Sequence, residues 1–446
     1  MSVKVGMVSL GCAKNQVDAE MLLSLVVRGG YELCAQPEHC QVVIVNTCGF
    51  IEDAKRESIE TILEFCQMKK TTGLKAVVVT GCLAERYRDD IAREIPEADV
   101  ILGIGKNADI AAAIGKALQG KKVVESAPKD QLALTGGRIL AGPGYSAYLK
   151  VADGCDNCCS YCAIPLIRGH FRSRPMEEIE QEARTLIAQG VKEINLVAQD
   201  TTRYGEDLYG SLMLPQLIER LCRLPGLVWL RILYCYPDRV TDQLLETMAA
   251  QPKVVKYMDI PLQHCDGGIL ADMNRSGDQA GLLALLGHVR AKIPGVVVRT
   301  TMIAGFPGET EGQFEALCNF VSEARFERLG CFAYSQEEDT PAGEMPGLLD
   351  DATRRRRAEL VMERQMQVAF DFSQSQLGRR LQILVEGFDE EQGLYGGRSY
   401  MDAPDVDTRV YFDAETGCKP GDFVQVEITG AEGYDLLGRI VTEDTP

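Results

Sequence analysis

Three cysteines in the middle of the chain have a spacing suited to redox chemistry. Cys155, Cys159 and Cys162 lie in the run Asp-Gly-Cys-Asp-Asn-Cys-Cys-Ser-Tyr-Cys. Iron–sulfur clusters prefer soft thiolate ligands, and three thiolates on a [4Fe–4S] cluster leave one iron open to a substrate or cofactor. A ferredoxin normally supplies a fourth cysteine instead. Cys158 interrupts the run, but adjacent cysteines rarely ligate one metal, so we interpret Cys158 as a bystander.

Two other interpretations of this motif remain open. Zinc sites favour two pairs of cysteines with two residues between the members of each pair, and no second pair follows here. A disulfide framework is typical of small secreted chains and does not suit this one. Inert thiols are the remaining alternative. The spacing therefore favours a cluster over zinc and over inert thiols.

Three more cysteines share a position in a predicted sheet. Cys12, Cys48 and Cys82 each follow a β-branched run that reads as a strand. The carboxyl ends of parallel strands line one rim of a sheet, where ligands bind, and helix amino termini there favour thiolates. These cysteines should therefore converge, although buried structural thiols are the alternative. Cys34, Cys40 and Cys66 share no such pattern and are expected to be ordinary thiols.

The elements that must position these cysteines alternate along the first half of the chain. Strands are predicted at 3–10, 42–45, 76–80 and 100–102, and helices at 17–28, 52–68, 84–94 and 110–118. Such alternation implies a parallel sheet with helices on its faces. We expect an α/β domain over residues 1–120 and a linker over 121–145, where Gly and Pro gather and a short strand would fit.

About six further strand–helix units follow. Strands are predicted at 147–152, 193–198, 228–234, 254–260, 296–303 and 328–334, with helices at 176–189, 214–223, 241–250, 278–291 and 311–324. Repeated parallel units close into a full or partial barrel whose active site lies at the carboxyl ends of the strands.

Polar residues at those strand ends are candidate ligands. Gln199 follows the second strand, Gln263 and His264 follow the fourth, and Gly305-Phe-Pro-Gly-Glu309 follows the fifth. Each is as readily explained as a loop residue that bonds backbone, and a lone histidine is more often structural than catalytic. Arg168 could pair with a carboxylate or simply lie at the surface.

The pattern changes after residue 350. A charged helix at 353–375 begins with four arginines, and its acidic neighbours suit a solvated linker helix better than an RNA-binding one. Short alternating strands follow at 381–387, 394–399, 408–412, 423–428 and 436–441. They predict a five-stranded β-barrel at 377–446, after a barrel domain with its linker helix at 146–376.

Charge and composition limit which kinds of molecule the protein is expected to bind. The chain of 446 residues carries a net charge of −18, and residues 377–446 hold 6 Lys and Arg against 15 Asp and Glu, a charge of −9. Nucleic acid would be repelled and a basic protein attracted. No apolar run is long enough to span a membrane, the start lacks the pattern of a signal peptide, and sixteen cysteines suit a reducing cytoplasm.

The central motif, with Tyr161 just before its last cysteine, resembles that of the radical S-adenosylmethionine (SAM) superfamily. The resemblance implies that the open iron binds SAM, which the reduced cluster cleaves to a 5′-deoxyadenosyl radical. Together with the second cysteine set and a terminal barrel resembling a TRAM domain, the whole chain resembles the methylthiotransferases. This resemblance implies two [4Fe–4S] clusters, one on each cysteine set, and contacts to SAM from Tyr161, Gln199, Gln263, Gly305 and Glu309.

Two motifs indicate the branch of that family. They are Met258-Asp-Ile-Pro-Leu-Gln-His264 and Gly397-Arg-Ser-Tyr-Met-Asp-Ala-Pro-Asp-Val-Asp407. With the acidic tail, they resemble the branch that modifies the β-carbon of an aspartate in the basic ribosomal small-subunit protein twelve. That reaction needs an external reductant and a sulfur donor. The alternatives are the branch that modifies adenosine in transfer RNA, and a non-enzymatic iron–sulfur or zinc module.

Overall fold

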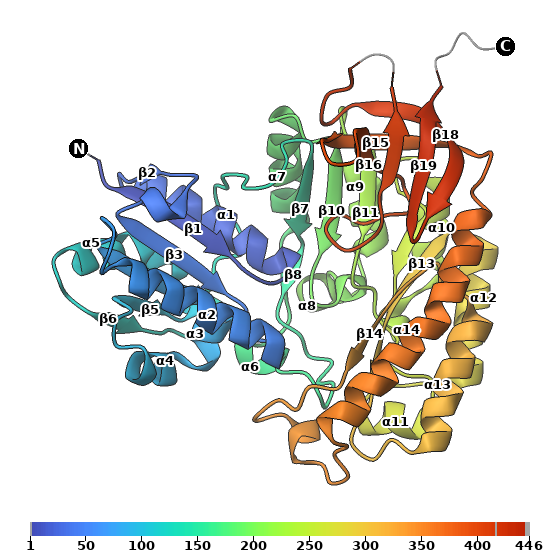
Figure 1. Ribbon diagram of the computed structural model, residues 1–446, viewed down its shortest axis with the longest axis horizontal. Coiled ribbons are helices and arrows are strands. Elements are labelled where there is room, and N and C mark those ends of the chain that lie inside the picture. The colour runs from blue at the N-terminus through green and yellow to red at the C-terminus, as the bar shows by residue number, and fades with distance from the viewer. Residues whose placement is uncertain (1, 415–416, 442–446) are drawn as a thin grey trace.

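In the computed structural model, which describes residues 2–414 and 417–441, the amino-terminal unit is a parallel sheet in the order β2-β1-β3-β4-β5-β6 (Figure 1). Its strands are β1 (Lys4–Ser9), β2 (Glu32–Leu33), β3 (Val42–Thr47), β4 (Ala76–Gly81), β5 (Val100–Leu102) and β6 (Val123–Glu125). Its helices are α1 (Ala13–Arg28), α2 (Glu52–Met68), α3 (Cys82–Arg86), α4 (Arg88–Glu94) and α5 (Ile110–Leu118). Strand β6 lies in the segment expected to be a linker, so the sheet extends past residue 120.

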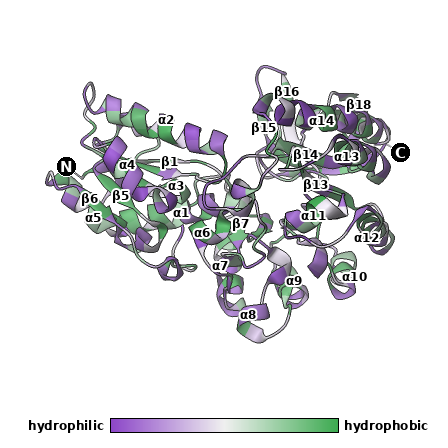
Figure 2. Ribbon diagram, turned by 90° about the horizontal axis from the view of Figure 1, so that it is seen from below, coloured by the Kyte–Doolittle hydropathy of each residue, from purple (hydrophilic) through white to green (hydrophobic). Residues whose placement is uncertain are grey.

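Both faces of this sheet are covered, and its central strands are apolar and buried over residues 42–45 and 76–79. Val43 and Val45 pack with α2, α3 and α4, while Val42 and Ile44 pack with α1 and α5. Burial on both faces is typical of a parallel sheet. In Figure 2, α2 carries both hydrophobic and hydrophilic bands, as expected of a helix with one face on a sheet.

The central unit is a partial barrel made of two parallel sheets, β11-β10-β7 and β12-β13-β14, which a bridge between Leu230 and Val254 joins. Its strands are β7 (Ser146–Lys150), β10 (Glu193–Val197), β11 (Trp229–Ile232), β12 (Tyr257–Asp259), β13 (Val297–Ala304) and β14 (Arg328–Ala333). Its main helices are α7 (Met176–Ala188), α9 (Leu214–Cys222), α10 (Asp242–Ala250), α12 (Gln279–Lys292), α13 (Glu311–Ala324) and α14 (Asp351–Gln374). Short elements between them are β8 (Ala152–Asp153), α6 (Ile164–Arg168), β9 (Arg172–Ser173), α8 (Glu206–Tyr209) and α11 (Gly267–Asp272). The predicted six strand–helix units are thus confirmed, although the fourth strand is shorter than expected.

The prediction that the last barrel helix is a solvated linker is wrong. Helix α14 packs on α13 and on strands β13 and β14. Arg357, Val361, Gln365 and Val368 are buried at spacings of three and four residues, so they form one stripe on the helix. Charged residues between them hide that stripe in the sequence.

The carboxyl-terminal unit is a closed five-stranded barrel in the order β15-β16-β17-β19-β18, as predicted. Its strands are β15 (Arg380–Asp389), β16 (Leu394–Arg398), β17 (Val410–Asp413), β18 (Phe423–Glu432) and β19 (Asp435–Ile440). It lies against one end of the central strands (Figure 1). Glu193 and Trp229, which begin β10 and β11, contact Arg398 and Phe423 of this barrel. The terminal barrel therefore covers the amino ends of the central strands and leaves their carboxyl ends free.

The motif at 397–407 explains this attachment. Arg398 binds Glu193, Asp402 binds Arg328, and Asp407 accepts a hydrogen bond from Tyr257. Several carboxylates of the acidic tail are therefore committed to the junction. Among the residues that the structure describes, no helix is long and apolar enough to cross a membrane.

Candidate active site

Three loops bring Cys12, Cys48 and Cys82 together at one rim of the amino-terminal sheet. Parallel pairing aligns Ser9 with Asn46 and Thr47 with Gly81, so strands β1, β3 and β4 end at the same level. A side chain at Gly11 would place its Cβ 2.8 Å from the Cβ of Cys48. Glycine at this position, with φ of +90°, is what allows the first two loops to approach so closely.

Positive charge surrounds this set of cysteines. An Nη of Arg168 donates to Cys82 Sγ over 3.3 Å. Cys12 is exposed at the rim; desolvation by its neighbours opposes a thiolate there, but Lys14 and Arg168 outweigh it and lower the pKa of Cys12. Burial dominates at the other two positions, raising the pKa of Cys48 to about 12 and raising that of Cys82. In the protein without metal, Cys12 is thus the member of the set that ionises most readily.

The second set, Cys155, Cys159 and Cys162, follows β8 on one tight loop. Cys162 N–H donates to the carbonyl of Cys159, and Cys155 N–H donates to the carbonyl of Gly169. All three are partly buried, and burial raises the pKa of Cys155 to about 11 and also raises that of Cys162. Cys158 is exposed, and the side chain of Asn274 holds its backbone carbonyl.

The donor set fits clusters better than single metal ions. Among the described residues, no three His, Cys, Asp or Glu side chains are close enough to hold one ion. Tetrahedral zinc needs its ligands around a single centre, whereas a [4Fe–4S] cluster spreads its thiolates over separate irons. All of these cysteines are free thiols, and the residues present therefore fit one cluster per set.

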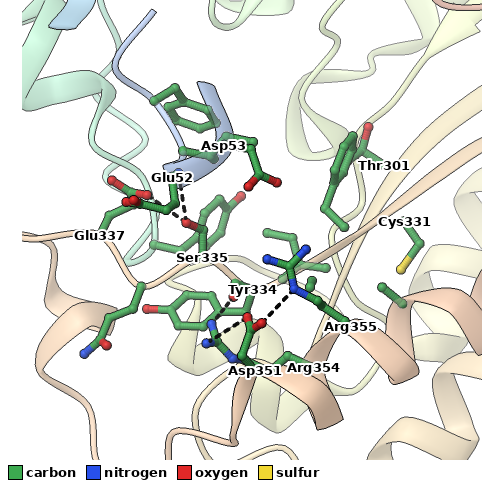
Figure 3. Close-up of a pocket in the computed structure, with 18 of the residues that line it drawn as sticks. Glu52, Asp53, Thr301, Cys331, Tyr334, Ser335, Glu337, Asp351, Arg354 and Arg355 are labelled. Atoms are coloured by element: carbon green, nitrogen blue, oxygen red, sulfur yellow. Dashed lines mark hydrogen bonds and ion pairs between the residues drawn. The ribbon is translucent and has the colours of Figure 1, made fainter. Parts of the chain in front are cut away.

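A cavity of about 660 Å³ lies between the two halves of the molecule. Figure 3 shows Glu52 and Asp53, from the start of α2, facing Asp351, Arg354 and Arg355 of α14 across it. Strands β13 and β14 contribute further wall residues, among them Thr301, Ile303, Cys331 and Ala333. The amino-terminal unit thus forms one wall of the cavity, and the central barrel with α14 forms the opposite wall.

Two of the five residues expected to contact SAM line this cavity, namely Tyr161 and Gln263. Tyr161 belongs to the loop of the second cysteine set, and burial together with Cys159 raises its pKa. Gln263 has φ of 75° and forms a parallel bridge with Met302, so a sharp turn aims it inward from the end of β12.

The other three expected contacts do not line it. Gln199 donates to Asp153 over 3.1 Å, and its own buried side-chain oxygen has no hydrogen-bond partner among the residues that the structure describes. Glu309 is buried, binds Arg357 at 2.6 Å and accepts from the backbone N–H of Gly305 at 2.9 Å. These contacts show Glu309 bound to protein groups that support the turn at 305–309.

Sequence reasoning missed several groups beside the cysteines. Arg275 donates to Cys159 Sγ over 3.7 Å and stacks on Tyr236 at 4.4 Å. Arg86 and Lys55 of the amino-terminal unit both bind the buried carboxylate of Glu337, at 2.6 Å and 3.2 Å. Their partners lie far away in the chain, so no local pattern in the sequence could have indicated these pairs.

Comparison with known proteins agrees with these three units. Residues 4–103 match an uncharacterized protein family named UPF0004, residues 149–321 match the radical SAM superfamily, and residues 377–441 match the TRAM domain. A solved structure of the radical SAM methyltransferase TsrM from Kitasatospora setae covers 77% of this chain and 77% of its own, with a TM-score of 0.56 and 15% identity. At that identity, the likeness shows a shared fold only.

Closer relatives match nearly the full length. A protein of Pelotomaculum thermopropionicum, named ribosomal protein uS12 methylthiotransferase RimO, is 46% identical, covering 99% of this chain and 100% of the relative. A protein of the same name from Geobacter sulfurreducens is 44% identical, covering 98% of this chain and 99% of the relative.

The fold and the relatives define the class of protein. The chain is a radical SAM enzyme, of a class that uses SAM and [4Fe–4S] clusters. Within that class it belongs to the family of RimO methylthiotransferases.

Proposed function

We propose that this enzyme transfers a methylthio group to the β-carbon of an aspartate in ribosomal protein uS12, the small-subunit protein twelve. Two observations carry the proposal. Phe50 and Ile51, which follow Cys48, and Tyr161, which precedes Cys162, line the same cavity. The chain is also 46% identical, over nearly its full length, to a relative named ribosomal protein uS12 methylthiotransferase RimO. The transfer-RNA alternative is not favoured, because the relatives that cover the chain are named for uS12.

The six cysteines have separate tasks in this proposal. Cys155, Cys159 and Cys162 hold one cluster, and Cys12, Cys48 and Cys82 hold the other. When bound, the first cluster with SAM supplies a carbon radical that can remove an unactivated hydrogen, and the second supplies sulfur. A radical is required because no side-chain base at neutral pH removes hydrogen from the β-carbon of an aspartate.

The cavity walls orient the reactants. Tyr161 and Gln263 contact SAM from the barrel side, where they line the cavity. Gln199, Gly305 and Glu309 complete the SAM site from the loops behind that wall, Glu309 by holding the backbone N–H of Gly305. Closely held reactants outside bulk water accelerate the transfer through proximity.

The carboxyl-terminal barrel supplies the docking surface for a basic protein substrate. Its charge is −9, and Glu390 and Glu391 lie exposed in the turn between β15 and β16 beside an exposed Phe388. Opposite charges steer association, and the effect falls as salt rises.

The test is reconstitution with defined substrates. Enzyme, SAM, a low-potential reductant, sulfide and unmodified uS12 or small subunits are incubated without oxygen, and the products are analysed by mass spectrometry. We expect one methylthio group on one aspartate of uS12. A C12A/C48A/C82A variant should still cleave SAM but give no product, C155A/C159A/C162A should do neither, and C34A is the control that should do both. Modification of transfer RNA with uS12 untouched would overturn the proposal.

A further inference from the structure

A buried group of charges joins the two cysteine sets. The side chains of Asp18, Lys150, Asp153 and Arg168 are each at most 3% exposed. Two of them are cationic and two anionic, so the group is neutral overall. Charges are costly to bury unless good geometry compensates, so the precise placement of this group needs a reason.

The guanidinium of Arg168 reaches both halves of the molecule. One terminal nitrogen binds the carboxylates of Asp18 in α1 and of Asp153 in β8, the latter at 3.1 Å. The other donates to Asn15 Oδ1 and to Cys82 Sγ, each over 3.3 Å. Arg168 thus contacts a cysteine of one set and the strand that leads into the other.

The partners of Arg168 bind, in turn, to the backbone next to the cysteine loops of both sets. The Asn15 amide donates to the carbonyls of Leu10 and Thr47, which precede the loops of Cys12 and Cys48. The Asp153 carboxylate accepts from the backbone N–H of Gly154, next to Cys155. The planar fork of a guanidinium can make these contacts in fixed directions, and an ammonium cannot.

We propose that Arg168 is a positioning residue that fixes the Cys12–Cys48–Cys82 site against the Cys155–Cys159–Cys162 loop and tunes the reduction potential of the cluster held there. A positive donor at a ligand sulfur stabilises the more negative, reduced cluster and therefore raises its potential. Loss of Arg168 should lower the potential of this cluster alone. The inference rests on the proposed ligation of two clusters by six cysteines.

The chain offers a matched control at the other cluster. Arg275 donates to Cys159 Sγ over 3.7 Å and its second terminal nitrogen donates to the carbonyl of Pro261 at 2.6 Å. Both of these bonds lie within the central barrel, so they do not involve the set of Cys12, Cys48 and Cys82. The two arginines are therefore equivalent in chemistry and differ in the cysteine set that they touch.

The experiment measures each cluster separately in the full chain. Variants R168K, D18N/R168Q and R275K are reconstituted with iron and sulfide, and iron is counted per chain. Electron paramagnetic resonance during a potentiometric titration then gives each midpoint potential. Signals are assigned from C12A/C48A/C82A and C155A/C159A/C162A chains. D18N/R168Q removes one anion together with the cation, so the buried group stays neutral. R168K keeps the positive charge at position 168 and removes only the guanidinium fork.

We expect D18N/R168Q to change the reduction equilibrium of the Cys12–Cys48–Cys82 cluster about tenfold, a shift of about 59 mV to lower potential for one electron. R168K should change the resonance signal of that cluster. R275K should change only the signal of the Cys155–Cys159–Cys162 cluster. The inference would be overturned if both Arg168 variants left the signal and the potential of the Cys12–Cys48–Cys82 cluster unchanged. It would also be overturned if D18N/R168Q shifted the potentials of both clusters equally. Unaltered iron content in C12A/C48A/C82A would instead refute the proposed ligation.

Discussion

Removing the charge of Glu193 should weaken the attachment of the terminal barrel. The Glu193 side chain is fully buried, and its carboxylate oxygens bind Arg398 at 2.6 Å and 3.1 Å and Arg231 at 3.3 Å. Ser146 donates a further hydrogen bond at 2.7 Å. Burial alone would raise the pKa of Glu193, but the two arginines outweigh it and lower that pKa to about 2.

The size of the effect follows from this shift. Lowering the pKa from the usual 4.5 to about 2 corresponds to about 3 kcal/mol of folding stability at neutral pH. Breaking a buried ion pair by removing one partner costs a similar amount, roughly 3–5 kcal/mol. The variant E193Q should therefore lose about 3 kcal/mol, because both arginines are left without a buried counter-charge.

The single tryptophan of the chain makes this measurable. Trp229 lies opposite Glu193 in the sheet register, and its ring contacts Phe423 of the terminal barrel at 4.8 Å. Its fluorescence during denaturant unfolding therefore reports the junction. E427Q is the control, because Glu427 pairs with an exposed arginine, Arg439, and is itself 30% exposed, so that this pair should contribute under about 1 kcal/mol. A loss under about 1 kcal/mol in E193Q would refute the reasoning.

Three further outcomes are expected. Because the pKa of Glu193 is depressed, its stabilisation is complete above pH 4.5 and lost as pH falls toward 2, so metal-free parent protein and E193Q should converge in denaturant midpoint across that window. G81A should destabilise the chain by at least about 2 kcal/mol and reduce bound iron, as thermal unfolding and iron analysis would show. The reason is that φ at Gly81 is +94° and an added Cβ would lie 2.5 Å from the carbonyl oxygen of Thr47. E337Q should lose about 3–5 kcal/mol by leaving Arg86 unpaired, whereas an unchanged melting temperature would contradict a structural role for that pair.

Sequence alone could place the cysteine sets because their positions follow from local rules. Apolar runs such as 42–45 and 76–80 show the strands, and parallel strands must end at a common rim. The five short alternating strands of the terminal barrel were equally readable. In each case, the information lies within a few residues of the feature that it predicts.

Long-range partners could not be predicted in the same way. Arg168 pairs with Asp18, which lies 150 residues earlier in the chain, and nothing near either residue distinguishes a buried arginine from a surface one. The stripe on α14 was missed because Arg357 and Gln365 belong to it, and such residues are usually exposed. Glu309 binds Arg357 and the backbone N–H of Gly305, and these partners could not be predicted because a motif shows that a turn exists and not which groups hold its side chains.

The junctions of this enzyme combine apolar contact with buried ion pairs, and the two have different effects. Apolar burial stabilises an interface without fixing direction, whereas bidentate charge pairs hold groups in set orientations. Arg168 binds Asp18 and Cys82, and Arg86 binds Glu337, so both arginines link the amino-terminal unit to the central barrel. Because the cavity lies between those two units, its shape depends on their mutual orientation. The buried charges are therefore best explained by the need to hold two cysteine sets at a constant separation, which stability alone would not require.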